Sequence, residues 1–154
     1  MADKLYASWA SGYAAFPETA GLRTFRQGFG VTFTIPAGRA EWIHLPVPTP
    51  VIVGNDRANL EKVIVLYHAR QNNELIEVHV FDGPRRISKF SGMRFTGDHS
   101  QGVEGGLSPK NVFVVRQPDI AFGIGVTLLV SNTSRTTDSE FFISSFGGDF
   151  FHTL

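Results

Sequence analysis

Residues 61–82, which read EKVIVLYHARQNNELIEVHVFD, decide the fold class of this chain. Two stretches within them, 61–70 and 74–82, are rich in β-branched, aliphatic and aromatic residues, which favour β-strands. Between these stretches stands Gln71-Asn72-Asn73, and asparagine tolerates the positive φ angle of a tight turn. The stretch therefore predicts two long antiparallel strands joined as a hairpin.

One face of this hairpin is almost wholly apolar. Side chains alternate between the two faces of a strand, so a turn centred on Asn72-Asn73 fixes which residues share a face. The apolar face consists of Val63, Val65, Tyr67, Ala69, Ile76, Val78 and Val80. We expect this face to form the core.

The opposite face is mixed in character. It consists of Lys62, Ile64, Leu66, His68, Arg70, Leu75, Glu77, His79 and Phe81. Contiguous apolar area on a surface marks a contact site, so three interpretations stay open: another copy of the chain, cover by the chain's own loops, or a ligand groove. We favour a homo-oligomer, with an interface formed by Ile64, Leu66, Leu75 and Phe81, together with Phe150 and Phe151 of the tail.

The rest of the chain continues the β pattern. Helical periodicity is nearly absent, and only 3–10 and 55–60 are weak helical candidates. Further strands are predicted at 22–26, 29–35, 41–45, 51–53, 86–90, 93–95, 111–116, 122–131 and 140–146. We therefore predict an all-β chain, a single-domain β-sandwich or jelly roll over 1–154 with about nine to eleven strands.

Composition narrows the function classes. The chain has 14 Lys and Arg against 14 Asp and Glu, so it lacks the positive charge that nucleic-acid binding requires. It contains no cysteine, no secretion signal and no apolar run long enough to span a bilayer. We expect a cytoplasmic protein with no nucleic-acid partner, no membrane contact and no cofactor.

A metal site is one alternative reading of the mixed face. In the predicted hairpin His68 lies opposite Glu77, with His79 on the same face, and two imidazoles with one carboxylate suit zinc or iron. This grouping would fit a metal-dependent enzyme of cupin-like type. The alternative is an ordinary polar pair across two strands. We favour the polar pair and assign no metal ligand and no catalytic residue.

Carbohydrate binding is a second alternative. Lectins with a sandwich fold use an exposed aromatic side chain together with Asp, Asn and Gly in loops. The candidates for ligand binding are Trp9, Trp42, Asp98 and His99, the last two in a polar loop over 91–109. The competing interpretation of Trp42 is a core or interface residue.

Three strings of sequence carry a family resemblance. They are Trp-x-His-x-Pro-x-Pro-Thr-Pro at 42–50, Val-His-Val-Phe-Asp-Gly at 78–83 and Phe-Gly-Gly-Asp-Phe at 146–150. Together they resemble an uncharacterised family of small bacterial β-sandwich proteins, which implies a fold and no activity. The closing strand with its aromatic end is similar to jelly rolls of the tumour-necrosis-factor and C1q type, which implies assembly through aromatic strand faces.

These observations favour a non-catalytic β-sandwich module that self-associates and serves binding or assembly. A carbohydrate-binding lectin is the first alternative, and the cupin-like enzyme is the second.

Overall fold

The computed structural model describes residues 4–102 and 106–152. Within these residues the chain forms fourteen strands and one short 3-10 helix, which confirms the all-β prediction. Four of the strands have only two or three residues, and they account for most of the excess over nine to eleven. The elements are β1 (Lys4–Ser11), η1 (Gly12–Ala14), β2 (Phe16–Pro17), β3 (Thr24–Gln27), β4 (Gly30–Ile35), β5 (Ala40–Val47), β6 (Ile52–Val53), β7 (Asp56–Arg57), β8 (Asn59–Ala69), β9 (Asn73–Asp82), β10 (Arg85–Phe90), β11 (Gly97–His99), β12 (Val112–Gln117), β13 (Ile124–Asn132) and β14 (Ser139–His152).

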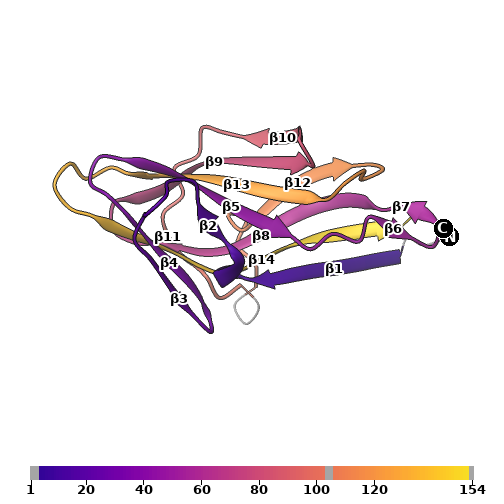
Figure 1. The fold of residues 1–154 in the computed structure, drawn as a ribbon, viewed down its shortest axis with the longest axis horizontal. Helices are drawn as coiled ribbons and strands as arrows, with labels where there is room; N and C mark the ends of the chain where they lie inside the picture. Colours follow the sequence, from indigo (N-terminus) through magenta and orange to yellow (C-terminus); the bar gives the residue numbers. More distant parts are fainter. Residues whose placement is uncertain (1–3, 103–105, 153–154) are drawn as a thin grey trace.

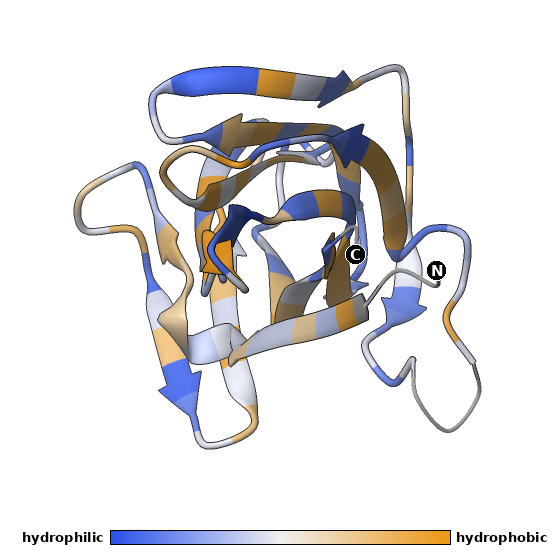
Figure 2. Ribbon diagram, turned by 90° about the vertical axis from the view of Figure 1, so that its right-hand side faces the viewer, coloured by the Kyte–Doolittle hydropathy of each residue, from blue (hydrophilic) through white to orange (hydrophobic). Residues whose placement is uncertain are grey.

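Two sheets form the layers of a sandwich (Figure 1). The seven-stranded sheet follows the order β11-β8-β14-β4-β3, and β1 and β12 pair with β14 and β8 beside this path. The five-stranded sheet follows the order β10-β9-β13-β5-β2. Figure 2 gives an end-on view, in which hydrophobic and hydrophilic residues follow one another along the strands. Both sheets therefore have an inner and an outer face.

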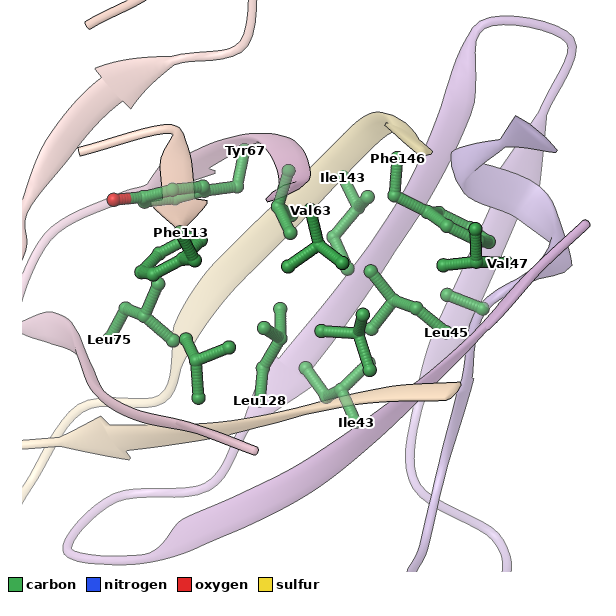
Figure 3. Close-up of a cluster of buried hydrophobic side chains, with 14 of the residues drawn as sticks. Ile43, Leu45, Val47, Val63, Tyr67, Leu75, Phe113, Leu128, Ile143 and Phe146 are labelled. Atoms are coloured by element: carbon green, nitrogen blue, oxygen red, sulfur yellow. The ribbon is translucent and has the colours of Figure 1, made fainter. Parts of the chain in front are cut away.

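The core lies between the inner faces and contains aliphatic and aromatic side chains from both sheets (Figure 3). Tyr67 on β8 stacks on Phe141 of β14, with ring centroids 5.5 Å apart. The Tyr67 hydroxyl donates a hydrogen bond to the carbonyl oxygen of Lys110, and burial raises the pKa of this phenol. Val63, Val65 and Ala69 are buried beside Tyr67, as the alternation along this strand predicts.

The predicted hairpin is wrong, although both of its strands exist. β8 belongs to the seven-stranded sheet and β9 to the five-stranded sheet, so the two strands do not pair with each other. Asn72 does adopt a positive φ of 57°, but the turn carries the chain from one layer to the other. The pattern of a buried face is the same for a hairpin and for such an arch, because in both cases one face of each strand meets the core.

A β-bulge corrects the predicted faces of β9. Leu75 pairs with Val130 and Glu77 pairs with Leu129, so Ile76 is an extra residue between two paired positions. The shift turns Leu75 into the core, where it is fully buried, and leaves Ile76 partly exposed. Alternation counted from the turn assigned these two residues the other way round.

The mixed face is therefore two separate surfaces. Ile64 and Leu66 lie on the outer face of the seven-stranded sheet, where they are buried at 2% and 7% exposure. A Cβ atom on Gly102 would lie 3.0 Å from Leu66, so the chain's own loop covers that residue. Glu77, His79 and Phe81 lie on the outer face of the other sheet.

Four residues of the predicted interface thus have no free surface. Ile64 and Leu66 are covered by the same chain, and Leu75 and Phe150 are fully buried in the core. Phe81 and Phe151 keep partial exposure. The second of the three open interpretations, cover by the chain itself, holds for Ile64 and Leu66 on the seven-stranded sheet.

The two ends of the chain pair as long strands. Residues 4–11 form β1 rather than a helix, and residues 55–60 likewise fall in a turn and strands. β1 pairs with the second half of β14, which runs straight through Gly147 and Gly148. A Cβ atom on Gly147 would lie 2.5 Å from the Ser8 carbonyl oxygen and 2.7 Å from the Trp9 ring. These glycines therefore permit close packing within a strand and do not form a turn.

No helix in the described part of the chain has the length and apolar character needed to cross a bilayer.

Candidate functional site

The outer face of the five-stranded sheet carries a row of aromatic and polar side chains. One row crosses the whole sheet: strand register places Lys89 beside His79, His79 beside Thr127, Thr127 beside His44, and His44 beside Phe16. The neighbouring rows add Trp42 on one side and Phe81, Gly125 and Pro46 on the other. We call this surface the aromatic groove; it comprises Phe16, Glu18, Trp42, His44, Pro46, His79, Phe81, Gly125 and Thr127.

The rings of the aromatic groove form two contacting groups. The Trp42 and His79 centroids are 5.0 Å apart, and the His79 and Phe81 centroids are 6.3 Å apart. On the other side the Phe16 and His44 centroids are 6.1 Å apart. All three pairs are tilted, which is a favourable arrangement for aromatic rings. The ring positions are therefore fixed by the sheet and by each other.

Polar contacts cross the middle of the aromatic groove. Nδ1 of His44 lies 3.0 Å from Oγ1 of Thr127, within hydrogen-bond distance. Nε2 of the same imidazole lies 3.4 Å from a carboxylate oxygen of Glu18. The backbone N–H of Glu18 donates to the carbonyl oxygen of Trp42, which holds this carboxylate beside the sheet. The Glu18 side chain is 60% exposed, so a ligand can reach it.

His79 is the most buried polar group of the aromatic groove. Its Nε2 atom has no hydrogen-bond partner within the described chain, and the nearest carboxylate oxygen, on Glu77, is 3.8 Å away. Burial lowers the pKa of His79, and the charges of Arg86 and Lys89 lower it further, while Glu77 offsets only part of this effect. The imidazole is therefore neutral at pH 7, and its Nε2 atom is buried without a hydrogen-bond partner among the described residues.

Two shallow hollows lie along the aromatic groove. The first has a volume of about 200 Å³ and lies among Glu18, Trp42, His44, His79, Phe81 and Thr127. The second has a volume of about 260 Å³ and is bounded by Phe16, His44, Leu45, Pro46, Phe81, Gly125, Val126 and Thr127. Since the two hollows share His44, Phe81 and Thr127, they form one continuous depression.

A larger hollow, of about 600 Å³, lies at one end of the sandwich. It has no aromatic wall, and its charged side chains already have partners. Arg70 and Glu140 form an ion pair at 2.9 Å, and Asp138 accepts a hydrogen bond from the Ala37 backbone. The Asn73 side chain also lines this hollow, and both of its polar atoms are buried without a hydrogen-bond partner among the described residues. The hollow therefore offers an amide but no apolar face of the kind that the aromatic groove presents.

The predicted ligand-binding residues do not form one site. Trp42 lies in the aromatic groove, whereas Trp9, Asp98 and His99 belong to strands of the seven-stranded sheet. Asp98 accepts two hydrogen bonds from Ser100, and this contact, with the nearby His68 and His99, outweighs burial and lowers the pKa of the carboxyl. His99 contacts the carbonyl oxygen of Thr96 at 2.9 Å. Asp98 and His99, which lie in β11 and not in a loop, thus both have local partners.

The metal alternative is wrong for a topological reason. His68 lies on β8, and Glu77 and His79 lie on β9, so the three residues are divided between two sheets. His68 faces Asp98 at 3.9 Å. Within residues 4–102 and 106–152, no three His, Asp or Glu side chains gather in a way that suits a metal ion.

Sequence reasoning missed most of the aromatic groove, although a signal was present. The strings at 42–50 and 78–83 supply Trp42, His44 and Pro46 on one strand and His79 and Phe81 on another. Alternation alone places each set on one strand face. Nothing in the sequence states that β13 lies between the two strands and contributes Gly125 and Thr127.

Comparisons with known proteins add a family and a fold neighbour. The model of DUF6623, a family of unknown function, matches residues 19–144, which confirms the expected match to an uncharacterised family. A search of curated proteins gave no match. Among solved structures, the chain is similar to TmCBM61 in complex with beta-1,4-galactotriose, with a TM-score of 0.44 and 11% identity over 90% of this chain and 86% of that chain. A similarity of this degree carries no argument about a ligand, and the likeness to tumour necrosis factor and C1q stays an expectation.

Proposed function

Since the chain belongs to DUF6623, a family of unknown function, we propose a function from its own surface: a binding module that recognises neutral carbohydrate in the aromatic groove. The observation that supports the proposal is the row of side chains that crosses the five-stranded sheet from Lys89 to Phe16, with its neighbouring rows. In these rows aromatic rings lie beside hydrogen-bonding groups. His79 and Phe81 lie on β9 on one side of Thr127, Trp42 and His44 lie on β5 on the other, and Phe16 lies beyond them on β2.

Sugar chemistry suits such a surface. A pyranose ring has an apolar C–H face, which packs on aromatic rings, and a rim of hydroxyl groups, which donate and accept hydrogen bonds. Trp42, Phe16 and Phe81 offer the apolar faces. His44, Thr127 and the exposed Glu18 offer polar atoms at fixed positions, and hydrogen bonds to a carboxylate are the stronger kind.

Charge favours a neutral sugar. Glu18 and Glu77 place carboxylates at two borders of the aromatic groove. Two cations lie at the β10 border: Lys89 is 3.6 Å from Glu77, so its charge is partly matched, and Arg86 lies beside Phe81 in the strand register. An acidic saccharide would meet like charge at the exposed Glu18, beside the middle of the aromatic groove.

The test compares the two tryptophans of the chain. A glycan array identifies ligands, and titration calorimetry measures their affinity for the wild type, Trp42→Ala and Trp9→Ala. We expect Trp42→Ala to weaken binding at least tenfold, about 1.4 kcal/mol or more. Trp9→Ala, on the other sheet, is the matched control and leaves the affinity unchanged. An array without hits, or equal losses in both variants, would contradict the proposal.

Self-association stays a second proposal, now on a different surface. β3 is the last strand of the seven-stranded sheet, and within the described residues it pairs only with β4 (Figure 1). Phe25 and Phe29 beside this edge are 61% and 64% exposed. An open strand edge with apolar side chains favours pairing with the same edge of a second copy. Sedimentation equilibrium of the wild type and Phe25→Ser tests this; a wild-type monomer at high concentration would remove it.

A further inference from the structure

The two hollows of the aromatic groove differ in the polar groups around them. Both present mainly apolar surface, but Glu18, His44, His79 and Thr127 place polar atoms around the first, beside Trp42. The second lies among Phe16, Pro46 and Phe81 around a floor at Gly125, with His44 and Thr127 at its border. Both hollows are therefore suited to the face of a ring, and the first also offers groups that bind hydroxyls.

Neither hollow is large enough to be a usual small-molecule site by itself. Such sites have volumes of roughly 300–1,000 Å³. The first hollow reaches about 200 Å³ and the second about 260 Å³, and they share three wall residues. Only a ligand that occupies both hollows uses a surface of ordinary size.

Gly125 is the residue that opens the second hollow. It lies inside β13, between Phe81 of β9 and Pro46 of β5. Its φ lies outside the left-handed region, so the backbone does not require glycine there. A Cβ atom would meet nothing within 4 Å, so packing within the chain does not require glycine either. Glycine weakens a strand, and inside one it often marks the close approach of a ligand.

The spacing of the two hollows follows the strand. Thr127 lines both hollows, and Gly125 lies two residues further along the same face of β13. Two residues of a strand advance about 6.6 Å. This step is comparable with the length of one sugar ring in a chain, so successive rings can follow β13 from one hollow to the next.

We propose that the aromatic groove binds a neutral saccharide chain of at least two linked rings along β13, with Gly125 leaving the space for the second ring. The proposal rests on the proposed function and adds the length and direction of its ligand. The first ring contacts Trp42 and the polar group of Glu18, His44 and Thr127. The second ring packs between Phe16 and Phe81 over Gly125.

Titration calorimetry with a ladder of sugars tests this proposal. The probes are glucose, galactose, mannose and xylose, their linear disaccharides to tetrasaccharides, and oligogalacturonates as acidic counterparts. For the sugar that binds, we expect the disaccharide or trisaccharide to bind at least tenfold more tightly than the monosaccharide. Oligogalacturonates of the same length bind more weakly than the neutral chains.

Gly125→Val is the decisive variant, because valine favours strands and its side chain fills the second hollow. We expect this variant to bind the chains no more than twofold more tightly than the monosaccharide. Ser131→Val is the matched control: it places the same valine side chain on the outer face of the same strand, at a position that lines neither hollow. We expect this control to bind the longer sugars more tightly than the monosaccharide, as the wild type does.

The outcomes separate the two proposals. Three results would overturn the proposal of a ligand with at least two linked rings and leave carbohydrate binding intact. They are equal affinity for sugars of every length, a wild-type gain in affinity with sugar length in Gly125→Val, and tighter binding of oligogalacturonates than of neutral chains. No binding of any probe would overturn both. Thermal denaturation of each variant shows that the affinities belong to folded protein.

Discussion

Nδ1 of His44 lies 3.0 Å from Oγ1 of Thr127, and this contact joins two neighbouring strands in the middle of the aromatic groove. His44 is on β5 and Thr127 on β13, directly opposite each other in the register. The contact holds the imidazole between the hydroxyl and Glu18, so both polar groups face the first hollow.

Loss of this hydroxyl should affect binding more than folding. Thr127→Val keeps the shape of the side chain and removes one hydrogen bond, whose net value is about 0.5–1.5 kcal/mol. We expect the affinity for the saccharide found on the array to fall about three- to tenfold, as measured by titration calorimetry. Thr127→Ser keeps the hydroxyl and should stay within twofold of the wild type. A loss in Thr127→Ser together with wild-type affinity in Thr127→Val would show that the methyl group, and not the hydroxyl, matters.

Two strand glycines should respond to alanine in opposite ways. At Gly147 the added Cβ would lie 2.5 Å from the Ser8 carbonyl oxygen, and overpacking of this kind costs about 1–3 kcal/mol. At Gly125 the added Cβ meets open space, and removal of glycine from a strand stabilises by about 0.5–1 kcal/mol. Urea denaturation should therefore give a lower free energy of unfolding for Gly147→Ala and a higher one for Gly125→Ala. The same sign in both variants would contradict this account of β14.

Asp82 should make the fold sensitive to acid. Burial alone would raise its pKa, but hydrogen bonds from the backbone N–H groups of Ala121, Phe122 and Gly123 outweigh that effect and lower the pKa below its ordinary value of 3.8. A depressed carboxyl pKa gives stability that is fully present above the ordinary value and is lost as the pH falls through the folded-state pKa.

The matching variant is Asp82→Asn, which loses the charge and one acceptor oxygen. Hydrogen bonds to a charged group contribute about 1.5–3 kcal/mol, so we expect a loss of about 3 kcal/mol at pH 7. The loss should shrink as the pH falls below 3.8, because the wild type then loses the same charge. Urea denaturation of the wild type and Asp82→Asn at several pH values measures this loss of stability and its change with pH. A loss of the same size at every pH would disprove the role of the charge.

His79 should give a second pH dependence, in a different range. Its pKa is lowered in the folded chain, chiefly by burial, so the unfolded chain binds a proton first as the pH falls below 6.5. Stability should therefore decrease with pH from 6.5 down to the folded-state pKa. His79→Phe removes the titrating group and the unpartnered Nε2 atom, so at pH 7 it should be at least as stable as the wild type. If the stability of His79→Phe falls below pH 6.5 as steeply as that of the wild type, another group causes the pH dependence.

Local sequence predicted the elements of this fold better than their partners. Alternation placed Val63, Val65 and Tyr67 in the core, because the period of a strand fixes its faces whichever strand lies beside it. The turn at Asn72 was also recognised, since its positive φ is a local property. The same turn chemistry serves an arch and a hairpin, so it could not show that β8 and β9 enter different sheets.

The candidate site shows the same limit. Trp42 was predicted to bind a ligand, and the structure places it in the wall of the aromatic groove together with other residues of the same string. Trp9, Asp98 and His99 were grouped with it only by residue type, and they lie on the other layer. The residue type determines which contacts a side chain can make, but only its position in the fold determines which other side chains lie close enough to act with it.

The sequence by itself determined the all-β class, the places of the long strands and the core face of β8. These follow from side-chain period, β-propensity and turn residues, all of which act within a few residues of the chain. The tertiary structure alone decided that β13 lies between β5 and β9, and so brought Gly125 and Thr127 between Trp42, His44 and Phe81. Pairing between distant strands depends on the packing of the whole core, because many partners satisfy the same local pattern and only one arrangement buries all the apolar faces together.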